Sequence, residues 1–388
     1  MASIPDQLTE KLISIRRHLH ENPELSYEEF ETTKAIKNWL DEANITIIDS
    51  NLETGVIAEI SGNKKGPVVA LRADIDALPI QEETDLPYTS KIQGKMHACG
   101  HDFHTAAIIG AAYLLKEKES SLNGTVRLIF QPAEESSNGA CKVIEAGHLR
   151  GVQAIFGMHN KPDLPVGTIG IKDGPLMAGV DRFEIEIHGV GTHAAVPDAG
   201  VDPIVASSQI VMALQTIVSR NISSSHNAVV SVTNIHSGNT WNVIPEKAIL
   251  EGTVRTFQAE TREKIPALMK RIIKGVSDAL GVKTEFRFYP GPPAVQNDKV
   301  LTDFSIHIAE KMNLNVISPT PSMAGEDFSF YQQEIPGSFV FVFMGTSGTH
   351  EWHHPAFTVD EKALPISAEY FALLAEEAIH QLLQTKSR

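Results

Sequence analysis

The chain has 388 residues and carries 33 Lys and Arg against 48 Asp and Glu, which gives a formal net charge of −15. Hydrophobic residues make up 42% and charged residues 21%, as in an ordinary globular protein, and this excludes disordered, collagen-like and coiled-coil chains. The negative charge repels a phosphate backbone and excludes a general nucleic-acid binder. No apolar run approaches the ~20 residues that span a bilayer, so we expect no membrane association.

The N-terminal residues 1–21 read as an amphipathic polar helix without the apolar core of a signal peptide. The two cysteines, Cys99 and Cys141, provide no disulfide framework and fit a reducing compartment. We therefore expect a cytoplasmic protein, and a length prior of ~150 residues per domain suggests two or three domains.

The first part of the chain alternates helical and strand patterns. The apolar spacing predicts helices at 7–19, 29–42, about 103–117 and about 138–146, and buried strands at 55–60, 68–73, 126–130 and 154–158. Strands separated by helices predict a largely parallel sheet with helices on both of its faces.

The pattern changes after the Gly- and Pro-rich stretch 174–179. Residues 181–190 alternate apolar and polar side chains, as a half-exposed antiparallel strand does. Asp202 and Pro203 predict the start of a helix at 203–219. Strands at 228–235 and 248–257, a helix at 260–279 and a strand at 283–289 complete a β-α-β-β-α-β order, which is the ferredoxin-like unit.

From about residue 291 the first pattern resumes. We expect a helix at 299–312, a strand at 338–344 and a long helix at 366–384. The fold class is therefore α/β, with one larger α/β domain formed by 1–178 and 291–388. A smaller α+β domain, 179–290, is inserted into it.

The densest cluster of chemically active side chains is the segment 96–104, Met-His-Ala-Cys-Gly-His-Asp-Phe-His. Cys99 and His101 are two residues apart, so both can reach one metal ion from a tight turn in which Gly100 relieves crowding. The alternative is a buried cysteine beside surface histidines.

Three further signals fall at predicted strand ends. Glu134 and Glu135 follow the strand 126–130, His159 ends another buried strand, and the tandem His353-His354 lies in a loop after 338–344. Each has an ordinary alternative, a solvated loop or a structural histidine. Ligand sites of α/β sheets lie at the carboxyl ends of the strands, so a metal centre is the best joint explanation. Adjacent carboxylates can also divide metal binding from proton transfer.

Two acidic segments have no fixed place in this scheme. Asp74, in the loop 72–79, is a candidate for orienting a ligand imidazole from behind, although a capped loop explains it equally well. The loop 325–329 contains Glu326 and Asp327 and can face the cleft in which the metal centre is expected.

The chain as a whole resembles the M20 metallopeptidase superfamily, in the amidohydrolase branch that includes N-acyl-amino-acid deacylases, hippurate hydrolases and auxin-conjugate hydrolases. The matching motifs, in order along the chain, are RADIDALP (72–79), MHACGHDFH (96–104), FQPAEE (130–135), GMHN (157–160), NVIPE (242–246), GTVRTF (252–257), GEDFSFY (325–331) and WHHPAF (352–357).

The resemblance implies two divalent metal ions and assigns a role to each matching residue. The implied metal ligands are Cys99 as the bridge, His101, Glu135, His159 and His353, with His354 as the fallback for His353. Glu134 takes the place of the catalytic acid and base. The wider superfamily has a histidine where this chain has Arg72 and an aspartate bridge where it has Cys99. A thiolate favours zinc, while the mixed ligand set also accepts manganese, cobalt or nickel.

The inserted domain resembles the family's lid and dimerisation domain. In it Asn242 and Arg255 suit a substrate carboxylate, and His193 is a further substrate-binding candidate. The resemblance also implies a homodimer or higher oligomer whose partner supplies one lid residue. Arg220, Asn221 and His226 occupy the right region for it.

We therefore expect a dinuclear-metal amidohydrolase that removes an N-acyl group, above all acetyl, from a small amino acid. The nearest alternative is a metal-dependent dipeptidase, which needs an acidic partner for a free amine, with Glu326 and Asp327 as candidates. Two less favoured alternatives are a hydrolase with Cys99 as its nucleophile and a non-catalytic metal-binding protein.

Overall fold

The computed structural model describes residues 4–345 and 348–386, and the chain forms two compact units. The first unit contains Met1–Leu176, Gln296–Thr320 and Asp327–Arg388, and the second contains Met177–Val295 and Pro321–Glu326. The predicted insertion, 179–290, lies within the second unit. Pro321–Glu326, a distant segment, also belongs to it.

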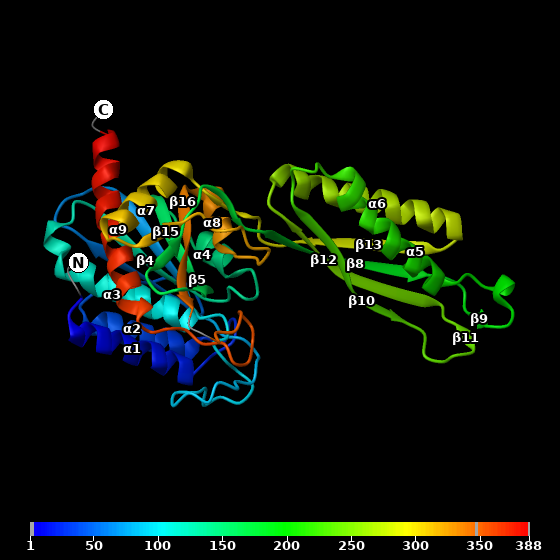
Figure 1. Ribbon diagram of the computed structural model, residues 1–388, viewed down its shortest axis with the longest axis horizontal. Coiled ribbons are helices and arrows are strands. Elements are labelled where there is room, and N and C mark those ends of the chain that lie inside the picture. Colours follow the sequence, from blue (N-terminus) through cyan, green and yellow to red (C-terminus); the bar gives the residue numbers. More distant parts are fainter. Residues whose placement is uncertain (1–3, 346–347, 387–388) are drawn as a thin grey trace. The chain divides into compact units, whose positions relative to one another are not determined.

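The first unit is built on an eight-stranded sheet with the order β1-β2-β4-β3-β5-β16-β6-β15 (Figure 1). The strands are β1 (Thr46–Ile48), β2 (Val56–Ser61), β3 (Val68–Asp74), β4 (Thr125–Gln131), β5 (Val152–Pro165), β6 (Thr168–Gly170), β15 (Asn315–Ile317) and β16 (Gly337–Gly345). The middle strands β4, β3, β5 and β16 are parallel. Strands β1 and β2 continue the sheet in antiparallel pairing, and β6 is antiparallel to β16.

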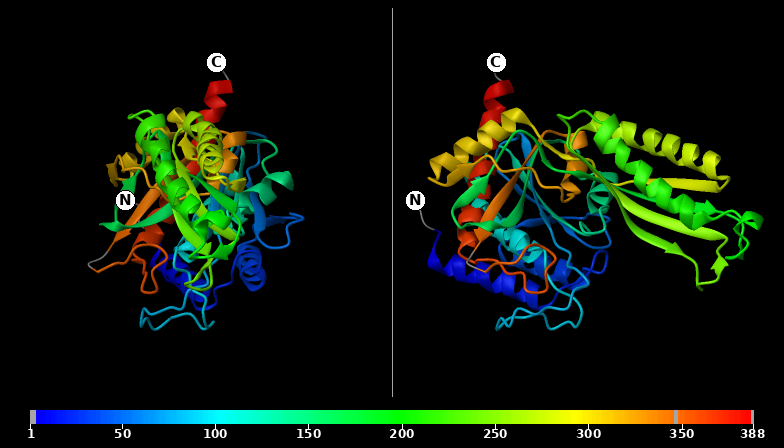
Figure 2. Two further views of the ribbon diagram at one scale, coloured as in Figure 1. Left: turned by 90° about the vertical axis from the view of Figure 1, so that its right-hand side faces the viewer. Right: turned by 45° about the vertical axis from the view of Figure 1, so that its right-hand side comes forward.

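Helices cover both faces of this sheet. They are α1 (Asp6–Glu21), α2 (Phe30–Glu42), α3 (His101–Glu117), α4 (Gly139–Glu145), α7 (Lys299–Lys311), α8 (Phe328–Glu334) and α9 (Ala363–Lys386). Helices α3 and α9 lie side by side against the strands, with α1 outside them, while α4 and α8 pack together on β4 and β5 (Figures 1 and 2).

Helix α3 is buried along almost its whole length, because its sequence is rich in Ala, Ile and Leu. A side chain at Gly110 would meet Leu12 Cδ1 at 2.6 Å and the Ala368 Cβ at 2.7 Å. This close approach of α1, α3 and α9 fixes α3 in the core. It thereby fixes His101, the first residue of α3.

The second unit has a four-stranded sheet of order β10-β12-β8-β13 in which all neighbours are antiparallel. Its strands are β8 (Gly179–His188), β10 (Ala228–Ser237), β12 (Lys247–Thr256) and β13 (Lys283–Pro290), and its helices are α5 (Pro203–Thr216) and α6 (Ala259–Leu280). The order along the chain and in space is that of a ferredoxin-like unit. The short strands β9 (Thr192–His193) and β11 (Val243–Ile244) form a separate pair.

Local sequence signals explain the start of α5 and the pattern of β8. The Asp202 carboxylate accepts hydrogen bonds from the amides of Ile204 and Val205, as an N-cap residue does. In β8, Phe183 and every second residue around it are buried, as the alternating sequence predicts.

The mixed α/β class is confirmed, but the sheet is less parallel than expected. Its parallel core of four strands is flanked by antiparallel pairs, because β2 is antiparallel to β4 on one side and β6 is antiparallel to β16 on the other. The outer strands β1 and β15 and the neighbouring strand β6 have three residues each, too few to give a detectable period. Two further short strands, β7 (Gly174–Met177) and β14 (Val295–Asn297), lie on the segments that connect the units.

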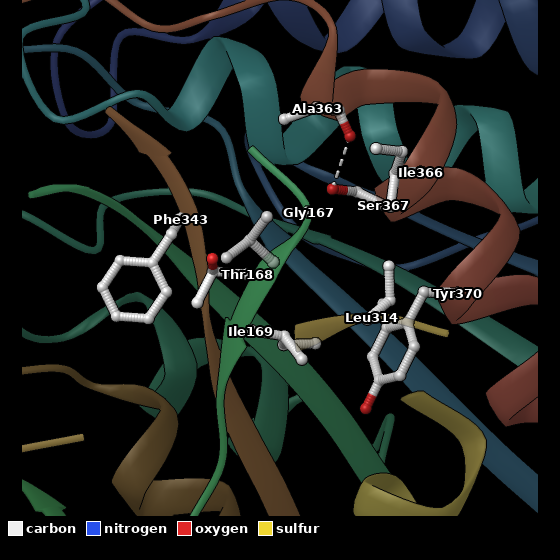
Figure 3. Close-up of a pocket in the computed structure, with 10 residues that line it drawn as sticks. Gly167, Thr168, Ile169, Leu314, Phe343, Ala363, Ile366, Ser367 and Tyr370 are labelled. Carbon is white, nitrogen blue, oxygen red and sulfur yellow. Dashed lines mark hydrogen bonds between the residues drawn. The ribbon is translucent and has the colours of Figure 1, made fainter. Parts of the chain in front are cut away.

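No helix among the described residues is both long and apolar enough to cross a bilayer. A small cavity lies between β6, β16 and α9, lined mainly by apolar side chains such as Ile169 and Phe343 (Figure 3). The hydroxyl of Ser367 points into this region but already donates to the Ala363 carbonyl at 2.8 Å (Figure 3). The cavity is therefore a packing gap of the core.

Candidate metal centre

The predicted site residues of the first unit meet at one edge of the sheet. Strand β3 ends at Asp74 and β4 ends at Gln131, and these two residues pair in register. Strand β5 is longer, but its pairing of Gly157 with Arg72 brings His159 to the level at which β3 ends. This is the carboxyl edge of parallel strands, where ligand sites of α/β sheets form.

Cys99, His101 and His159 form the first group of ligand atoms, which lie within 4.8 Å of one another. The Cys99 Sγ is 3.4 Å from the His159 Nε2. Gly100, between Cys99 and His101, has φ +85°, and a Cβ there would lie 2.3 Å from the Asn160 Nδ2. A glycine is therefore required for the turn that presents Cys99 and His101 together.

Cys99, Glu135 and His353 form a second group within the same 4.8 Å limit. The Glu135 Oε1 is 3.4 Å from the His353 Nε2 and 3.9 Å from the His101 Nε2. Cys99 belongs to both groups, so its sulfur occupies the place that a bridging ligand between two ions requires.

Hydrogen bonds orient two of the imidazoles toward the centre. The His101 Nδ1 is 2.9 Å from the Asp76 carbonyl oxygen and 3.2 Å from Asp76 Oδ1, both acceptors. The His159 Nδ1 donates to the Asn160 carbonyl at 2.8 Å. Both Nε2 atoms therefore face the site, the arrangement that metal-binding histidines use.

The structure separates His353 from its neighbour His354. The His353 amide donates to the Ala98 carbonyl at 2.8 Å, and the backbone is left-handed there, with φ +65°. These features turn the His353 ring toward Glu135. The His354 Nδ1 instead accepts from the Ala356 amide at 3.0 Å, and its ring stacks on His350.

Glu134 and Glu135 are held in a turn that begins at Ala133, which has φ +55°. The amides of Glu134 and Glu135 donate to Asp76 Oδ1 and Oδ2 at 3.1 and 3.0 Å. Glu134 is 8% exposed, and its Oε1 accepts from the Asp327 amide at 3.3 Å. The two carboxylates therefore sit beside the thiol and imidazoles in a fixed orientation.

The electrostatics of this centre favour a cation. Burial alone would lower the pKa of His101, but Asp74, Asp76 and Glu135 raise it to about 10. Burial, followed by Glu135 and Glu134, holds the pKa of the Cys99 thiol well above its ordinary value. A free thiolate nucleophile is therefore disfavoured here, which weakens the Cys-nucleophile alternative.

Two buried polar atoms at the centre are unsatisfied by the protein. The His101 Nε2 and the Glu135 Oε1 have no hydrogen-bond partner among the residues that the structure describes. Buried polar atoms without partners are costly, and a metal ion would satisfy both. The donor set of thiol, imidazole and carboxylate fits first-row divalent ions.

Asp74 lies one layer behind the centre. Its Oδ1 is 2.6 Å from the His104 Nδ1, and its Oδ2 pairs with the Arg72 Nη1 at 2.6 Å. The His104 Nε2 in turn accepts from the Asn160 amide at 2.8 Å. Asp74 thus orients His104 directly, and its Oδ2 also lies 3.9 Å from the His101 Nε2. Asp76 is the aspartate that contacts the His101 Nδ1.

The acidic residue Asp327 is engaged by the protein. Its carboxylate accepts from the Arg72 Nη2 at 2.8 Å and from the Gln131 Nε2 and the Ala140 amide at 2.9 Å. Burial raises its pKa to about 6 against the opposing effect of Arg72. These contacts leave little capacity for binding a substrate amine.

Sequence reasoning missed Asp76, His104 and Asn160 as members of the site. The signal for Asp76 was its spacing of two from Asp74, directly after a strand. His104 stood within the histidine-rich segment. Asn160 carried no separate signal, although its side chain contacts the Cys99 carbonyl, the His104 ring and the Trp352 indole.

The candidate substrate residues of the second unit fall into two places. His193 pairs with Val243, and the Asn242 carbonyl accepts from the Ala194 amide at 3.0 Å, so His193 and Asn242 are neighbours at the β9–β11 pair (Figure 1). Arg255 lies near the other end of β12, paired with Val180. It is half-buried, and its Nη1 is 3.5 Å from the Met323 carbonyl.

These positions are far apart within the unit. The strand β12 runs from Lys247 to Thr256, and at ~3.3 Å per residue its length exceeds that of a small amino-acid derivative. Asn242 and Arg255 of one chain therefore do not contact the same small substrate.

The model of Peptidase family M20/M25/M40 matches residues 70–377 of this chain. The N-acetylcysteine deacetylase of Bacillus subtilis is 58% identical over 94% of this chain and 96% of its own length. The Arabidopsis thaliana IAA-amino acid hydrolase ILR1-like 5 is 42% identical over 97% of this chain and 88% of its own.

A solved structure shares the fold over nearly the whole chain. The YXEP protein of Bacillus subtilis, described as a dinuclear metal binding peptidase from the M20 family, has a TM-score of 0.87 and 53% identity. The match covers 97% of this chain and 99% of that one. The resemblance read from the motifs is thus confirmed: this chain belongs to Peptidase family M20/M25/M40 and is a hydrolase of amide bonds.

Proposed function

We propose that this enzyme is a dinuclear-metal amidohydrolase that removes the N-acyl group, most simply acetyl, from a small amino acid and releases the free amino acid and a carboxylate. The observation that carries the proposal is Cys99, whose sulfur belongs to two adjacent ligand groups with Glu134 beside them. The names of the 58% identical deacetylase and the 42% identical amino-acid-conjugate hydrolase support an N-acyl amino acid as the substrate.

The residues that would hold two ions are Cys99, His101, Glu135, His159 and His353. The unsatisfied His101 Nε2 and Glu135 Oε1 support this set, as does the dinuclear centre named for the YXEP protein. When bound, the ions supply Lewis acidity to the acyl carbonyl and lower the pKa of a water. Zinc, manganese, cobalt and nickel all suit these ligands.

Glu134 is the proposed general acid and base. Its backbone is fixed by Asp76 and its Oε1 by the Asp327 amide, so the carboxylate has a defined direction. In this position it removes a proton from the attacking water and returns it to the leaving amine. Glu135 serves as a metal ligand, so the two neighbouring glutamates have different tasks.

A homodimer is proposed because the second unit exposes apolar side chains that a soluble monomer covers. Trp241 is 92% exposed, Met212 72% and Ile235 54%. Strand β10, which carries Ile235, is also an edge strand of its sheet. A second copy of the chain would cover these groups, and light scattering should give a dimer or higher oligomer. A fully active monomer would contradict the dimer.

The same dimer accommodates the two separated substrate residues. Because Asn242 and Arg255 of one chain cannot contact one small substrate, each site would combine one of them with a residue of the second copy. Arg255 offers a bidentate fork for the α-carboxylate, and Asn242 and His193 offer hydrogen bonds.

The two free cysteines, Cys99 and Cys141, accord with a reducing compartment such as the cytoplasm.

A dipeptidase is the alternative, and the word peptidase in the description of the YXEP protein favours it. A dipeptide presents a free α-amine, which requires an acidic partner. Asp327 is occupied by Arg72, Gln131 and the Ala140 amide. Glu326, the other acidic candidate, is buried. The names of the deacetylase and the amino-acid-conjugate hydrolase make the deacylase the preferred function.

The test is a matched substrate series: an N-acetyl amino acid, its methyl ester and the corresponding dipeptide. Each is assayed with enzyme loaded with one of the four metals and with chelator-treated enzyme. We expect fastest cleavage of the N-acetyl acid, a large loss for the ester and no turnover after metal removal. Clear preference for the dipeptide would establish the dipeptidase, and equal cleavage of the ester would exclude Arg255 as the carboxylate anchor.

A further inference from the structure

Two buried carboxylates hold three successive amides at the turn that presents Glu134. The Ala133 amide donates to Glu29 Oε1 at 2.8 Å, and the amides of Glu134 and Glu135 donate to Asp76 Oδ1 and Oδ2. Asp76 also contacts His101, so it belongs to the metal centre. Glu29 lies outside the candidate ligand set.

Glu29 is itself rigidly placed. It is fully buried at the start of α2, and its second oxygen, Oε2, accepts from the Thr54 hydroxyl at 2.8 Å. Its backbone carbonyl accepts from the Thr33 amide at 2.9 Å. The carboxyl group is therefore fixed at both oxygens and through its own main chain.

The residue that Glu29 holds has an unfavourable backbone conformation. Ala133 has φ +55°, a region that residues with a Cβ rarely adopt without outside support. Pro132, which precedes it, is packed so closely that a Cβ on Gly55 would lie 2.7 Å from its Cδ. The turn is therefore held by the packing of Pro132 against Gly55 and by the hydrogen bond from the Ala133 amide to Glu29.

Burial, with a contribution from Asp76, raises the pKa of Glu29 to about 7. The carboxyl group is thus kept in a place that disfavours its charge. Its Oε1 accepts the Ala133 hydrogen bond in both protonation states, so its contribution is the placement of an acceptor.

We propose that Glu29 is a positioning residue that fixes the left-handed Ala133 and thereby the direction of the Glu134 carboxylate. The inference rests on the proposed role of Glu134 as acid and base. Loss of Glu29 lets the turn relax at Ala133 and swings Glu134 away from the reacting atoms. Four of the five proposed ligands, Cys99, His101, His159 and His353, lie on other segments and keep their places. The fifth, Glu135, lies in the turn itself, where its amide is held by Asp76 Oδ2 at 3.0 Å.

The first test compares Glu29→Ala and Glu29→Gln with Glu28→Ala, a control at the exposed neighbouring position. We expect kcat of Glu29→Ala to fall about 10- to 100-fold, the range seen when a supporting residue behind an active group is removed. KM should stay within about threefold. All variants are compared at saturating metal, because the proposed ligand Glu135 lies in the same turn. Glu29→Gln keeps an acceptor oxygen and should retain most of kcat, and Glu28→Ala should match the wild type.

The second test uses the strain at Ala133. Glycine adopts φ > 0 at no steric cost, so Ala133→Gly should leave wild-type kcat nearly unchanged and partly restore kcat in the Glu29→Ala background. A merely structural role for Glu29 would show no such recovery. If Glu29→Ala does not fold, Thr54→Val, which removes only the hydroxyl on Glu29 Oε2, should lower kcat severalfold.

The outcomes separate this proposal from the proposed function. If Glu134→Gln is inactive but Glu29→Ala has wild-type kcat, the positioning role of Glu29 is overturned. If Glu29→Ala does not fold, the same conclusion follows from wild-type kcat in Thr54→Val. Equal losses in Glu29→Ala and Glu29→Gln that Ala133→Gly does not relieve also overturn the positioning role. Full activity of Glu134→Gln overturns the role of Glu134 itself.

Discussion

Replacing Asp76 by asparagine should weaken metal binding and turnover together, because one carboxylate supports both. Its Oδ1 contacts the His101 Nδ1 and the Glu134 amide, and its Oδ2 accepts from the Glu135 amide and from the Ser26 hydroxyl at 2.7 Å. Asparagine keeps the size of the side chain but turns one acceptor into a donor.

The magnitude follows from these contacts. If the amide oxygen keeps the bonds to His101 and Glu134, the amide nitrogen of the new side chain faces the Glu135 N–H, and the two donors cannot pair. A buried donor left unpaired costs about 1–3 kcal/mol. The hydrogen bond to His101 also loses its charge, and loss of such support lowers metal affinity about 10- to 100-fold.

The assay is competition for the metal between the protein and a chromophoric chelator, with kcat measured at saturating metal. Asp49→Asn, at an exposed position of the same unit, is the control and should match the wild type. Tight wild-type metal binding and full kcat in Asp76→Asn would refute the view that Asp76 organises the centre.

Three further predictions concern the centre directly. Glu134→Gln should retain both metals and lose about two to four orders of magnitude in kcat, as removal of a positioned acid and base does; near wild-type kcat would contradict this. Cys99→Ala should lower metal occupancy as well as activity, and full occupancy by elemental analysis would exclude the bridge. In the metal-free protein the pKa of His101 is raised from 6.5 to about 10. Protonation of His101 therefore stabilises the fold fully below pH 6.5, and this stabilisation is lost as the pH rises through about 10. Urea unfolding should show that decline without metal and not with it, because a bound ion replaces the proton.

Local patterns in the sequence predicted the elements well wherever an element carries its own periodicity. The β-α-β-β-α-β order of the second unit and the N-cap at Asp202 depend on neighbouring residues alone. The antiparallel entry of β2 beside β4 depends on a pairing between Val56 and Phe130, which no local window contains.

The site residues likewise divide into those with a local sequence signal and those placed by contacts between distant segments. Cys99, His101, Glu134 and Glu135 stood out because chemically active residues cluster in short segments. Glu29 did not stand out, since a glutamate at the start of an amphipathic helix reads as a surface residue. Its carboxylate is buried and accepts from the amide of Ala133, which is 104 positions away in the chain. Supporting residues of this kind become visible only when distant segments are brought together.

The central claim is that two metal ions occupy the centre around Cys99 and are required for amide hydrolysis. The most direct measurement is a metal titration of chelator-treated enzyme, with bound metal and turnover of an N-acetyl amino acid followed in the same samples. We predict that turnover reaches its maximum as two ions bind per chain. Full turnover by enzyme that contains no metal would contradict the claim.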